Sequence, residues 1–279
     1  MSTWDLRQSF GSSQGEIKFD VFGAGRPIVL LHGTPSWSYI WRDVVEILAQ
    51  HWSVHVYDFA GYGGSAKYAG QDVSIAAQAE VFCELLDHWR LDRPFVVGHD
   101  FGGATSLRAL TLKRRAFAGL ALMDAVALRP WGTPFSRLVH QHIEVFQQVP
   151  PHIFAGMVAA HMRTAIDKPM SDAELAPYLA PWLAPGGQDA YLRMVAGYDE
   201  RYTAEMEGLY AAIDIPTLVL WGENDRWLDP SFAVKLAQAI PGACLQMIPD
   251  AGHFLPEDQP EAVAKALEHF FAEIRRKAA

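Results

Sequence analysis

The chain has 279 residues, of which half are hydrophobic and a fifth are charged. This balance is typical of a globular domain and excludes a disordered chain, a collagen-like fibre and a disulfide-stapled miniprotein. The 32 acidic residues outnumber the 23 Lys and Arg residues, which gives a formal net charge of −9. We therefore expect neither a nucleic-acid partner nor an anionic membrane partner.

The two cysteines, Cys83 and Cys244, lie far apart in the sequence. Both occupy apolar stretches, so we expect two buried thiols in a reducing compartment. The N-terminal segment lacks the apolar core of a signal peptide, and no apolar run reaches the ~18 residues of a membrane span. These features predict a cytoplasmic protein, either a monomer or a homodimer.

Short runs rich in Val, Ile and Leu alternate with longer helical patterns along the chain. Continuous apolar runs are typical of strands that helices cover on both faces. The expected strands are 16–22, 27–32, 53–58, 94–99, 120–125, 216–222 and 244–250. The expected helices are 38–50, 73–89, 102–115, 230–240 and 260–277. This alternation predicts the α/β fold class, with a mostly parallel, doubly wound sheet.

One long segment, 129–212, interrupts the alternation because its pattern is helical and contains no convincing strand. It lies between two expected strands of the sheet. Ligand sites in open α/β sheets lie beyond the carboxyl ends of the strands, where such an insertion would cover them. We therefore expect a core made of 1–128 and 213–279 and an inserted helical cap made of 129–212.

The sequence Val97-Gly98-His99-Asp100-Phe101-Gly102-Gly103 directly follows an expected strand and precedes an expected helix. A nucleophile on such a sharp turn needs very small neighbours two residues away on either side, and Gly98 and Gly102 meet that need. The residue at the turn is Asp100 rather than serine. A carboxylate there would attack a carbon atom and form an alkyl ester.

Two further polar residues follow strands later in the chain. Asp225 comes after strand 216–222, and His253 comes after strand 244–250. The chain order of nucleophile, acid and histidine is that of α/β hydrolases. The sequence therefore predicts a catalytic triad of Asp100, Asp225 and His253. Asp124, which ends another strand, is the alternative position for the triad acid.

A glycine-containing turn, His32-Gly33-Thr34-Pro35, follows the strand near the N-terminus. In this type of fold, such a loop contributes a backbone N–H that acts together with the N–H after the nucleophile. The expected oxyanion-hole donors are therefore Thr34 and Phe101.

Motifs of one superfamily are spread over nearly the whole chain, as HGTPSWSYIWR, YDFAGYGGS, VVGHDFGG, WGENDRWLDP and AGHFLPEDQPE. Together they resemble the α/β-hydrolase superfamily, in the branch whose nucleophile is an aspartate. This branch includes haloalkane dehalogenases, epoxide hydrolases and fluoroacetate dehalogenases. HGTPSWSYIWR is most similar to the dehalogenases, whereas GHDFGG is closer to the epoxide hydrolases. The resemblance implies an α/β-hydrolase fold with an inserted cap.

The resemblance also implies a mechanism. Asp100 displaces a leaving group at a saturated carbon, and His253, oriented by Asp225, then activates the water that hydrolyses the ester. The N–H groups of Thr34 and Phe101 stabilise the developing oxyanion. The substrate would be a small, largely apolar molecule, and no metal or organic cofactor is expected.

The residue that stabilises the leaving group distinguishes the subfamilies. The dehalogenases resemble one another in a Trp directly after the nucleophile, but this chain has Phe101 there, so Trp131 and Trp182 of the cap are the candidate donors. Fluoroacetate dehalogenases usually have Arg at that position. Epoxide hydrolases use two cap tyrosines, for which Tyr198 and Tyr202 are the candidates, although the usual early one is missing.

Two groups of polar residues have plain structural interpretations. Asp58 is expected to stabilise the turn after its strand. The cap histidines His140, His142, His152 and His161 fit no common zinc spacing and are expected to face solvent or to pack within the cap.

The residues favour epoxide hydrolysis, because Phe101 removes a halide donor while cap tyrosines are available. Dehalogenation of a haloalkane or haloacid is the close alternative, and hydrolysis of an ester or lactone is a more distant one. An alternative of a different class is a ligand receptor that has the hydrolase fold but no turnover.

Overall fold

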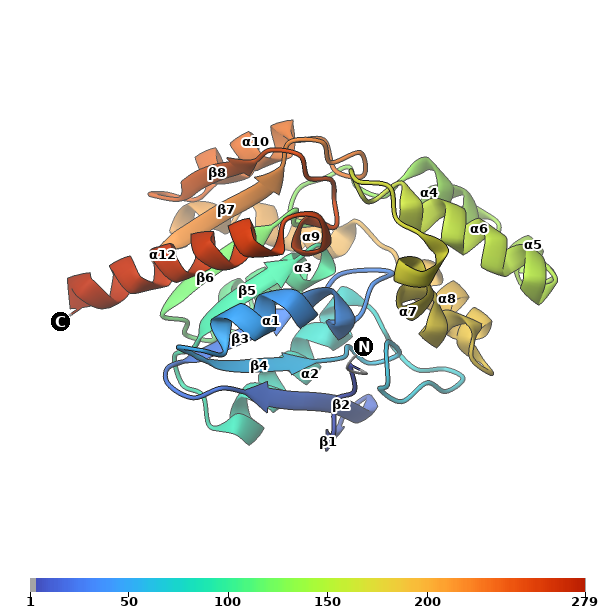
Figure 1. Ribbon diagram of the computed structural model, residues 1–279, viewed down its shortest axis with the longest axis horizontal. Coiled ribbons are helices and arrows are strands. Elements are labelled where there is room, and N and C mark those ends of the chain that lie inside the picture. The colour runs from blue at the N-terminus through green and yellow to red at the C-terminus, as the bar shows by residue number, and fades with distance from the viewer. Residues whose placement is uncertain (1–3, 279) are drawn as a thin grey trace.

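The computed structural model describes residues 4–278, which form one large sheet with helices on both faces (Figure 1). The strands are β1 (Gln8–Ser12), β2 (Gly15–Phe22), β3 (Pro27–Leu31), β4 (Ser53–Tyr57), β5 (Phe95–His99), β6 (Gly119–Met123), β7 (Thr217–Gly222) and β8 (Cys244–Ile248). Their spatial order is β1-β2-β4-β3-β5-β6-β7-β8. The β1–β2 and β2–β4 pairs are antiparallel, and all other neighbours are parallel.

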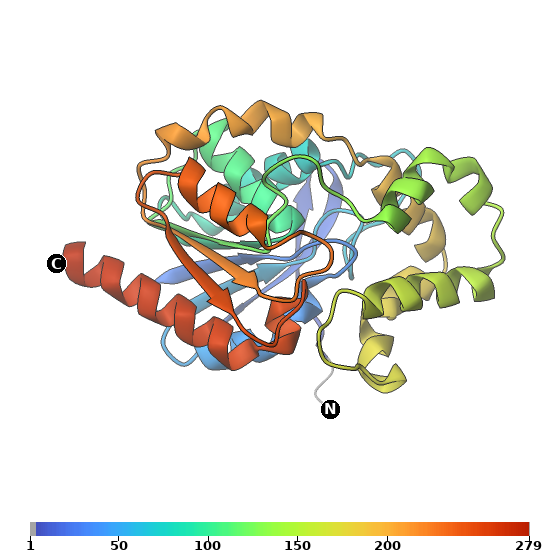
Figure 2. The same ribbon diagram turned by 90° about the horizontal axis from the view of Figure 1, so that it is seen from above.

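Helices flank the sheet as a doubly wound fold requires. The core helices are α1 (Arg42–Leu48), α2 (Ile75–Trp89), α3 (Phe101–Thr111), α10 (Ser231–Ala239), α11 (Leu255–Asp258) and α12 (Pro260–Ala278), with 3₁₀ turns at Ser38–Trp41 and Tyr210–Ala212. Helices α1 and α12 pack together on one face, while α2, α3 and α10 lie on the other (Figure 2). The predicted α/β class and doubly wound sheet are confirmed.

The central strands are buried along almost their whole length, which explains their continuous apolar sequences. Every residue of β5, β6 and β7 is buried. The two edges differ. Strand β1, whose sequence QSFGS is largely exposed, was not expected from the pattern. At the other edge, β8 begins with exposed residues, so Cys244 is exposed and the expectation that it is buried is wrong, whereas Cys83 is buried.

The segment between β6 and β7 is helical. Its helices are α4 (Pro134–Gln141), α5 (Ile143–Phe146), α6 (Pro151–Arg163), α7 (Asp172–Leu183), α8 (Gly187–Ala196) and α9 (Arg201–Glu207). Helices α4–α8 lie together beyond the carboxyl ends of the strands (Figures 1 and 2). Helix α9 instead packs against α3 on the face of the sheet. The part that covers the strand ends therefore stops earlier than the predicted boundary at 212.

A buried carboxylate joins the core to one side of the cap. Asp258 accepts backbone N–H groups from Asp167 at 2.9 Å and Lys168 at 3.3 Å, both in the α6–α7 connection. It also accepts the N–H of Gly252 at 2.8 Å, in the loop after β8. One side chain thus fixes two loops that are far apart in the sequence. Within residues 4–278, no helix is long and apolar enough to cross a bilayer.

Candidate active site

Asp100 lies on the sharp turn between β5 and α3, with φ 50° and ψ −116°. A non-glycine residue with positive φ is strained and needs support from its surroundings. Tight packing of backbone supplies that support: a Cβ atom at Gly98 would lie 2.4 Å from the carbonyl oxygen of Gly102, and one at Gly102 would lie 2.3 Å from that of Leu31. The two glycines are therefore required here.

One oxygen of the Asp100 carboxylate is held by the loop after β3. The backbone N–H of Thr34 donates to Asp100 Oδ1 at 2.7 Å. The N–H of Phe101, the other expected donor, begins α3 and makes no hydrogen bond with any residue in the range 4–278. Thr34 therefore contacts Asp100 as an oxyanion-hole donor would, and the Phe101 N–H has no partner among residues 4–278.

The loop that carries Thr34 is itself fixed by a buried histidine. Burial lowers the pKa of His32 to about 3, so its ring is neutral. Its Nε2 accepts the N–H of Phe59 at 2.9 Å, and its Nδ1 lies 2.9 Å from the carbonyl oxygen of Gly33. A neutral ring with one acceptor and one donor nitrogen satisfies both contacts.

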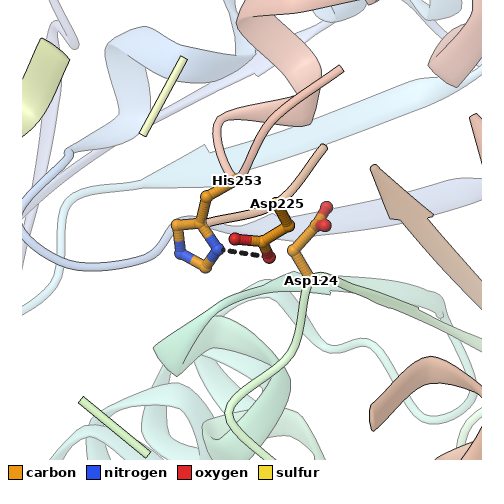
Figure 3. Close-up of side chains that lie close together, drawn as sticks. All are labelled: Asp124, Asp225 and His253. Carbon is orange, nitrogen blue, oxygen red and sulfur yellow. Dashed lines mark hydrogen bonds and ion pairs between the residues drawn. The ribbon is translucent and has the colours of Figure 1, made fainter. Parts of the chain in front are cut away.

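His253 and Asp225 follow neighbouring parallel strands and form a buried pair (Figure 3). His253 Nδ1 lies 2.9 Å from Asp225 Oδ2, while Asp225 Oδ1 accepts the backbone N–H groups of Trp227 at 2.7 Å and Leu228 at 3.0 Å. On the other side of the ring, His253 Nε2 lies 3.3 Å from Asp100 Oδ2. The three residues predicted as a triad are thus brought into one line of contacts.

The charge of His253 depends on these two carboxylates. Burial alone disfavours the imidazolium, but the charge of Asp225, together with Asp100, outweighs it and raises the pKa of His253 well above its ordinary value. His99 lies beneath, with its Nε2 2.8 Å from the carbonyl oxygen of His253. Burial lowers the pKa of His99 to about 4, so it acts as a neutral support.

A second carboxyl group lies beside Asp225. Asp124, directly after β6, places an oxygen within 4.8 Å of polar atoms of both Asp225 and His253 (Figure 3). Three such atoms are close enough to share a metal ion. However, His253 Nδ1 already contacts Asp225, and Asp124 Oδ1 accepts the N–H of Gly222 at 2.9 Å. We interpret the cluster as a hydrogen-bonded network rather than a metal site.

A narrow cavity of about 30 Å³ lies over Asp100 and His253. It has room for about two water molecules. Its walls combine core and cap: Thr34, Pro35, Asp100, Phe101, Val126, Trp131, Gly132, Thr133, Ser136, His161, Tyr191, Tyr198, Trp227, Leu228 and His253.

Comparison with known proteins agrees with this fold. The profile of the alpha/beta hydrolase fold family matches residues 26–260. The chain belongs to that family. Haloalkane dehalogenase 2 of Mycobacterium bovis is 29% identical over 92% of each chain, and a soluble epoxide hydrolase of Corynebacterium sp. is 27% identical over 91% of this chain and 92% of its own. An alpha/beta hydrolase fold protein of Burkholderia ambifaria has 40% identity and a TM-score of 0.92, covering 95% of this chain and 97% of its own.

In this α/β hydrolase, two of the four cap residues that the sequence suggested as substrate contacts line the cavity. Tyr198 lines it, packs on the ring of Phe101 at 5.1 Å, and has its hydroxyl 3.3 Å from Thr34 Oγ1. Trp131 also lines it, but its indole N–H donates to Thr203 Oγ1 at 3.1 Å. Trp131 is therefore a wall residue whose donor is already used.

The other two candidates do not line this cavity. The indole N–H of Trp182 donates to the carbonyl oxygen of Pro35 at 2.7 Å, so it is not the donor that the sequence suggested. Tyr202 lines a separate, more open cavity of about 510 Å³ and accepts a hydrogen bond from Arg201. The predictions that Trp182 and Tyr202 contact the substrate are therefore not supported by their positions, which depend on packing that the sequence pattern did not reveal. The two cavities adjoin, because Trp131, Gly132 and Tyr198 line both.

The hydrolase also has cavity residues that the sequence did not single out. Tyr191 lies seven residues before Tyr198, about two helical turns, and this spacing could have indicated a shared face. His161 of α6 packs within the cap, against Phe135 at 4.7 Å, as expected, and it also lines the cavity. Its ring stacks on Trp227 at 4.4 Å, and Trp227 stacks on His253 at 5.0 Å.

The remaining interpretation from sequence concerns Asp58. Its carboxylate accepts the backbone N–H groups of Ser38 at 3.0 Å and Gly64 at 2.7 Å. Asp58 therefore stabilises the turn after β4, as expected.

Proposed function

We propose that this chain is a cofactor-free hydrolase that opens a small, largely apolar epoxide through an ester on Asp100. One observation carries the choice of substrate: two tyrosines, Tyr191 and Tyr198, line the same cavity as Asp100. The indole N–H groups of Trp131 and Trp182, by contrast, already donate to protein oxygens. Phenolic hydroxyls are suitable acids for the oxygen that epoxide opening releases.

In the first step, Asp100 Oδ2 attacks an epoxide carbon and the carbon–oxygen bond of the ring breaks. A tyrosine hydroxyl gives its proton to the released oxygen and becomes a phenolate. Asp100 Oδ1, which accepts the Thr34 N–H at 2.7 Å, becomes the carbonyl oxygen of the ester. The contact thus leaves Oδ2 as the attacking atom.

In the second step, His253 takes a proton from water as the hydroxide attacks the ester carbonyl. Forming the ester removes the charge of Asp100, which helps to raise the pKa of His253, so this pKa falls and the ring releases its proton to solvent to become a neutral base. The N–H groups of Thr34 and Phe101 stabilise the oxyanion on Oδ1. His253 then protonates the departing diol oxygen, and the proton on the regenerated Asp100 carboxyl restores the tyrosine. The ring regains a proton from solvent once the Asp100 carboxylate is restored.

The test is the intact-protein mass of a His253→Gln variant after exposure to butene oxide or bromobutane. Without its base, the enzyme is expected to stall at the ester, so the adduct records what Asp100 attacked. A gain equal to the whole epoxide supports the proposal. The matched double variant Asp100→Asn/His253→Gln controls for adducts on other residues, and an equal gain in that variant would exclude Asp100 as the nucleophile.

Dehalogenation is the second candidate, because the N-terminal motif HGTPSWSYIWR favours it and the haloalkane dehalogenase of M. bovis is 29% identical. A gain equal to a butyl group, with bromide released, would support this candidate instead. No adduct from either probe would shift the assignment to ester hydrolysis or to ligand binding without turnover. Cytoplasmic location and a monomeric or dimeric state stay predictions from the sequence.

A further inference from the structure

Asp124 is a buried acid that the proposed mechanism does not use. It directly follows β6, its side chain is completely buried, and its backbone has a positive φ of 41°. Oδ1 accepts one hydrogen bond, from the Gly222 N–H at 2.9 Å. Oδ2 is buried and has no hydrogen-bond partner in the part of the chain that the structure describes. A strained residue with an unpartnered buried oxygen calls for a physical reason.

Asp124 lies beside the acid of the predicted triad. The titratable groups around Asp124 are Asp225, which follows β7, and His253, which follows β8. Two carboxyl groups this close in a dry site cannot both be ionised. Asp225 accepts two backbone N–H groups and contacts His253 Nδ1, whereas Asp124 accepts a single N–H. The hydrogen bonds therefore stabilise the charge on Asp225.

Asp124 is then the group that carries the proton. Burial, followed by the charge of Asp225, raises the pKa of Asp124 well above its ordinary value. A proton makes the Asp124 carboxyl a hydrogen-bond donor, and Asp225 is the neighbouring acceptor. The pair is then a neutral carboxyl next to a carboxylate. Figure 3 shows Asp225 between His253 and Asp124.

We propose that Asp124 is a second acid for His253. While Asp225 is ionised, Asp124 stays neutral and positions Asp225. When the charge of Asp225 is removed, Asp124 takes its place. The proposal rests on the triad of the proposed function. Its basis is the placement of Asp124 and Asp225 at the ends of adjacent parallel strands, with both within 4.8 Å of one histidine. Once the like charge is gone, Asp124 can release its proton and orient His253 itself.

Three variants test the replacement by kinetics with butene oxide: Asp124→Asn, Asp225→Ala and the double variant. Loss of a triad acid without a substitute lowers kcat by about 10⁴-fold. We expect that full loss only in the double variant, a loss of about 10–100-fold in Asp225→Ala, and a several-fold loss in Asp124→Asn. Such non-additivity identifies residues that act as alternatives. An Asp225→Ala variant already as inactive as the double variant would overturn the proposal.

The pH profile separates a positioning acid from a merely structural one. In Asp225→Ala, activity depends on the ionised form of Asp124, so the acidic limb of the profile should move to higher pH than in the unchanged enzyme. An unmoved acidic limb contradicts the proposal.

A second measurement needs no substrate, so it separates this proposal from the proposed function. In the unchanged protein labelled with ¹³C-aspartate, the Asp124 carboxyl signal should be that of the protonated form at pH 7. With ¹⁵N-histidine, the His253 Nδ1–H signal should persist in Asp225→Ala and disappear in the double variant. An ionised Asp124 at pH 7 overturns the proposal even if Asp225→Ala does not fold. If these signals appear as expected but neither probe reacts, the proposed function fails and the acid pair stands.

Discussion

The residues at the strand ends and the residues of the cap are held in different ways. Asp100 and Asp225 are fixed by backbone N–H groups, at 2.7 Å from Thr34 and 2.7 Å from Trp227 respectively. Cap residues such as Tyr198 are placed mainly by ring packing, which for Tyr198 is against Phe101 at 5.1 Å. The comparison indicates that the proposed catalytic residues are fixed by the backbone of the core, whereas the proposed substrate-contacting residues are placed by side-chain packing.

The strongest test of the residues at the strand ends is the variant Asp100→Asn. The amide is nearly isosteric but is not a nucleophile, so turnover of butene oxide should fall by about 10⁴-fold or more. Steady-state kinetics measures the loss. Asp172→Asn, at an exposed position that begins α7, is the matched control and should keep its activity. Residual turnover in Asp100→Asn within tenfold of the unchanged enzyme would refute the role of Asp100.

The backbone contacts around the nucleophile predict a large loss of stability in Gly102→Ala. The new methyl group would lie 2.3 Å from the carbonyl oxygen of Leu31, so α3 and β3 would have to separate. We expect the free energy of unfolding to fall by about 3 kcal/mol. Urea denaturation checks this, and a midpoint equal to that of the unchanged protein would show that the turn tolerates a side chain.

Buried histidines in both regions predict that stability depends on pH. Burial lowers the pKa of His99 in the core and of His161 in the cap to about 4. In the unfolded chain this pKa is about 6.5, so between pH 4 and 6.5 the unfolded state binds more protons. The contribution of these two histidines to the free energy of unfolding is therefore largest above about pH 6.5 and falls as the pH is lowered, by roughly 1–3 kcal/mol for each histidine.

Urea denaturation between pH 7.5 and 5 measures this slope. His161→Asn should make the slope shallower without removing it, because His99 is unchanged. An identical slope in the variant would mean that His161 titrates alike in both states.

The variants Tyr191→Phe and Tyr198→Phe test the residues of the cap. Each change removes one acid for the epoxide oxygen, so kcat for butene oxide should fall by about 10–100-fold. Tyr202→Phe is the control, since Tyr202 lines the separate cavity. If Tyr202→Phe loses as much activity as the other two variants, the proposed donors are wrong.

The smallest expected effect is on stability, in the variant Gly156→Ala, and its direction is opposite to that of Gly102→Ala. Gly156 lies inside α6, and a Cβ atom there would have no heavy atom within 4 Å. Gly156→Ala should therefore raise the free energy of unfolding by about 0.5–1 kcal/mol, because alanine is the better helix former. A thermal unfolding scan measures it, and destabilisation would indicate that the cap is packed more tightly than these contacts imply.

The core could be predicted from the sequence because its strands are continuous apolar runs. Strand 27–32 was expected and Pro27–Leu31 is observed, and the parallel order then brings Asp100, Asp225 and His253 to one edge of the sheet. The sequence of β1, QSFGS, lacks such a run, so its pairing with β2 was missed. The exposure of Cys244 was missed for a related reason, since the pattern does not say which strand lies at an edge.

The cap could not be predicted at the same level. Its helical character is readable, but Trp182 and Tyr202 were as plausible as Tyr191 and His161, because aromatic residues occur all along 129–212. Which ring faces the nucleophile depends on how α6, α7 and α8 pack against one another. The sequence likewise does not reveal that Asp124 lies close enough to Asp225 to interact with it, which only the structure shows.

The carboxylate of Asp258 limits how this enzyme can be re-engineered. It binds the Gly252 N–H, next to His253, and also the Asp167 N–H in the α6–α7 connection. A chimera that receives a foreign cap without matching amides at this connection would leave Asp258 short of donors and free the loop of His253 to shift. Cap exchange should therefore retain 164–170 together with Asp258, or replace both as a unit.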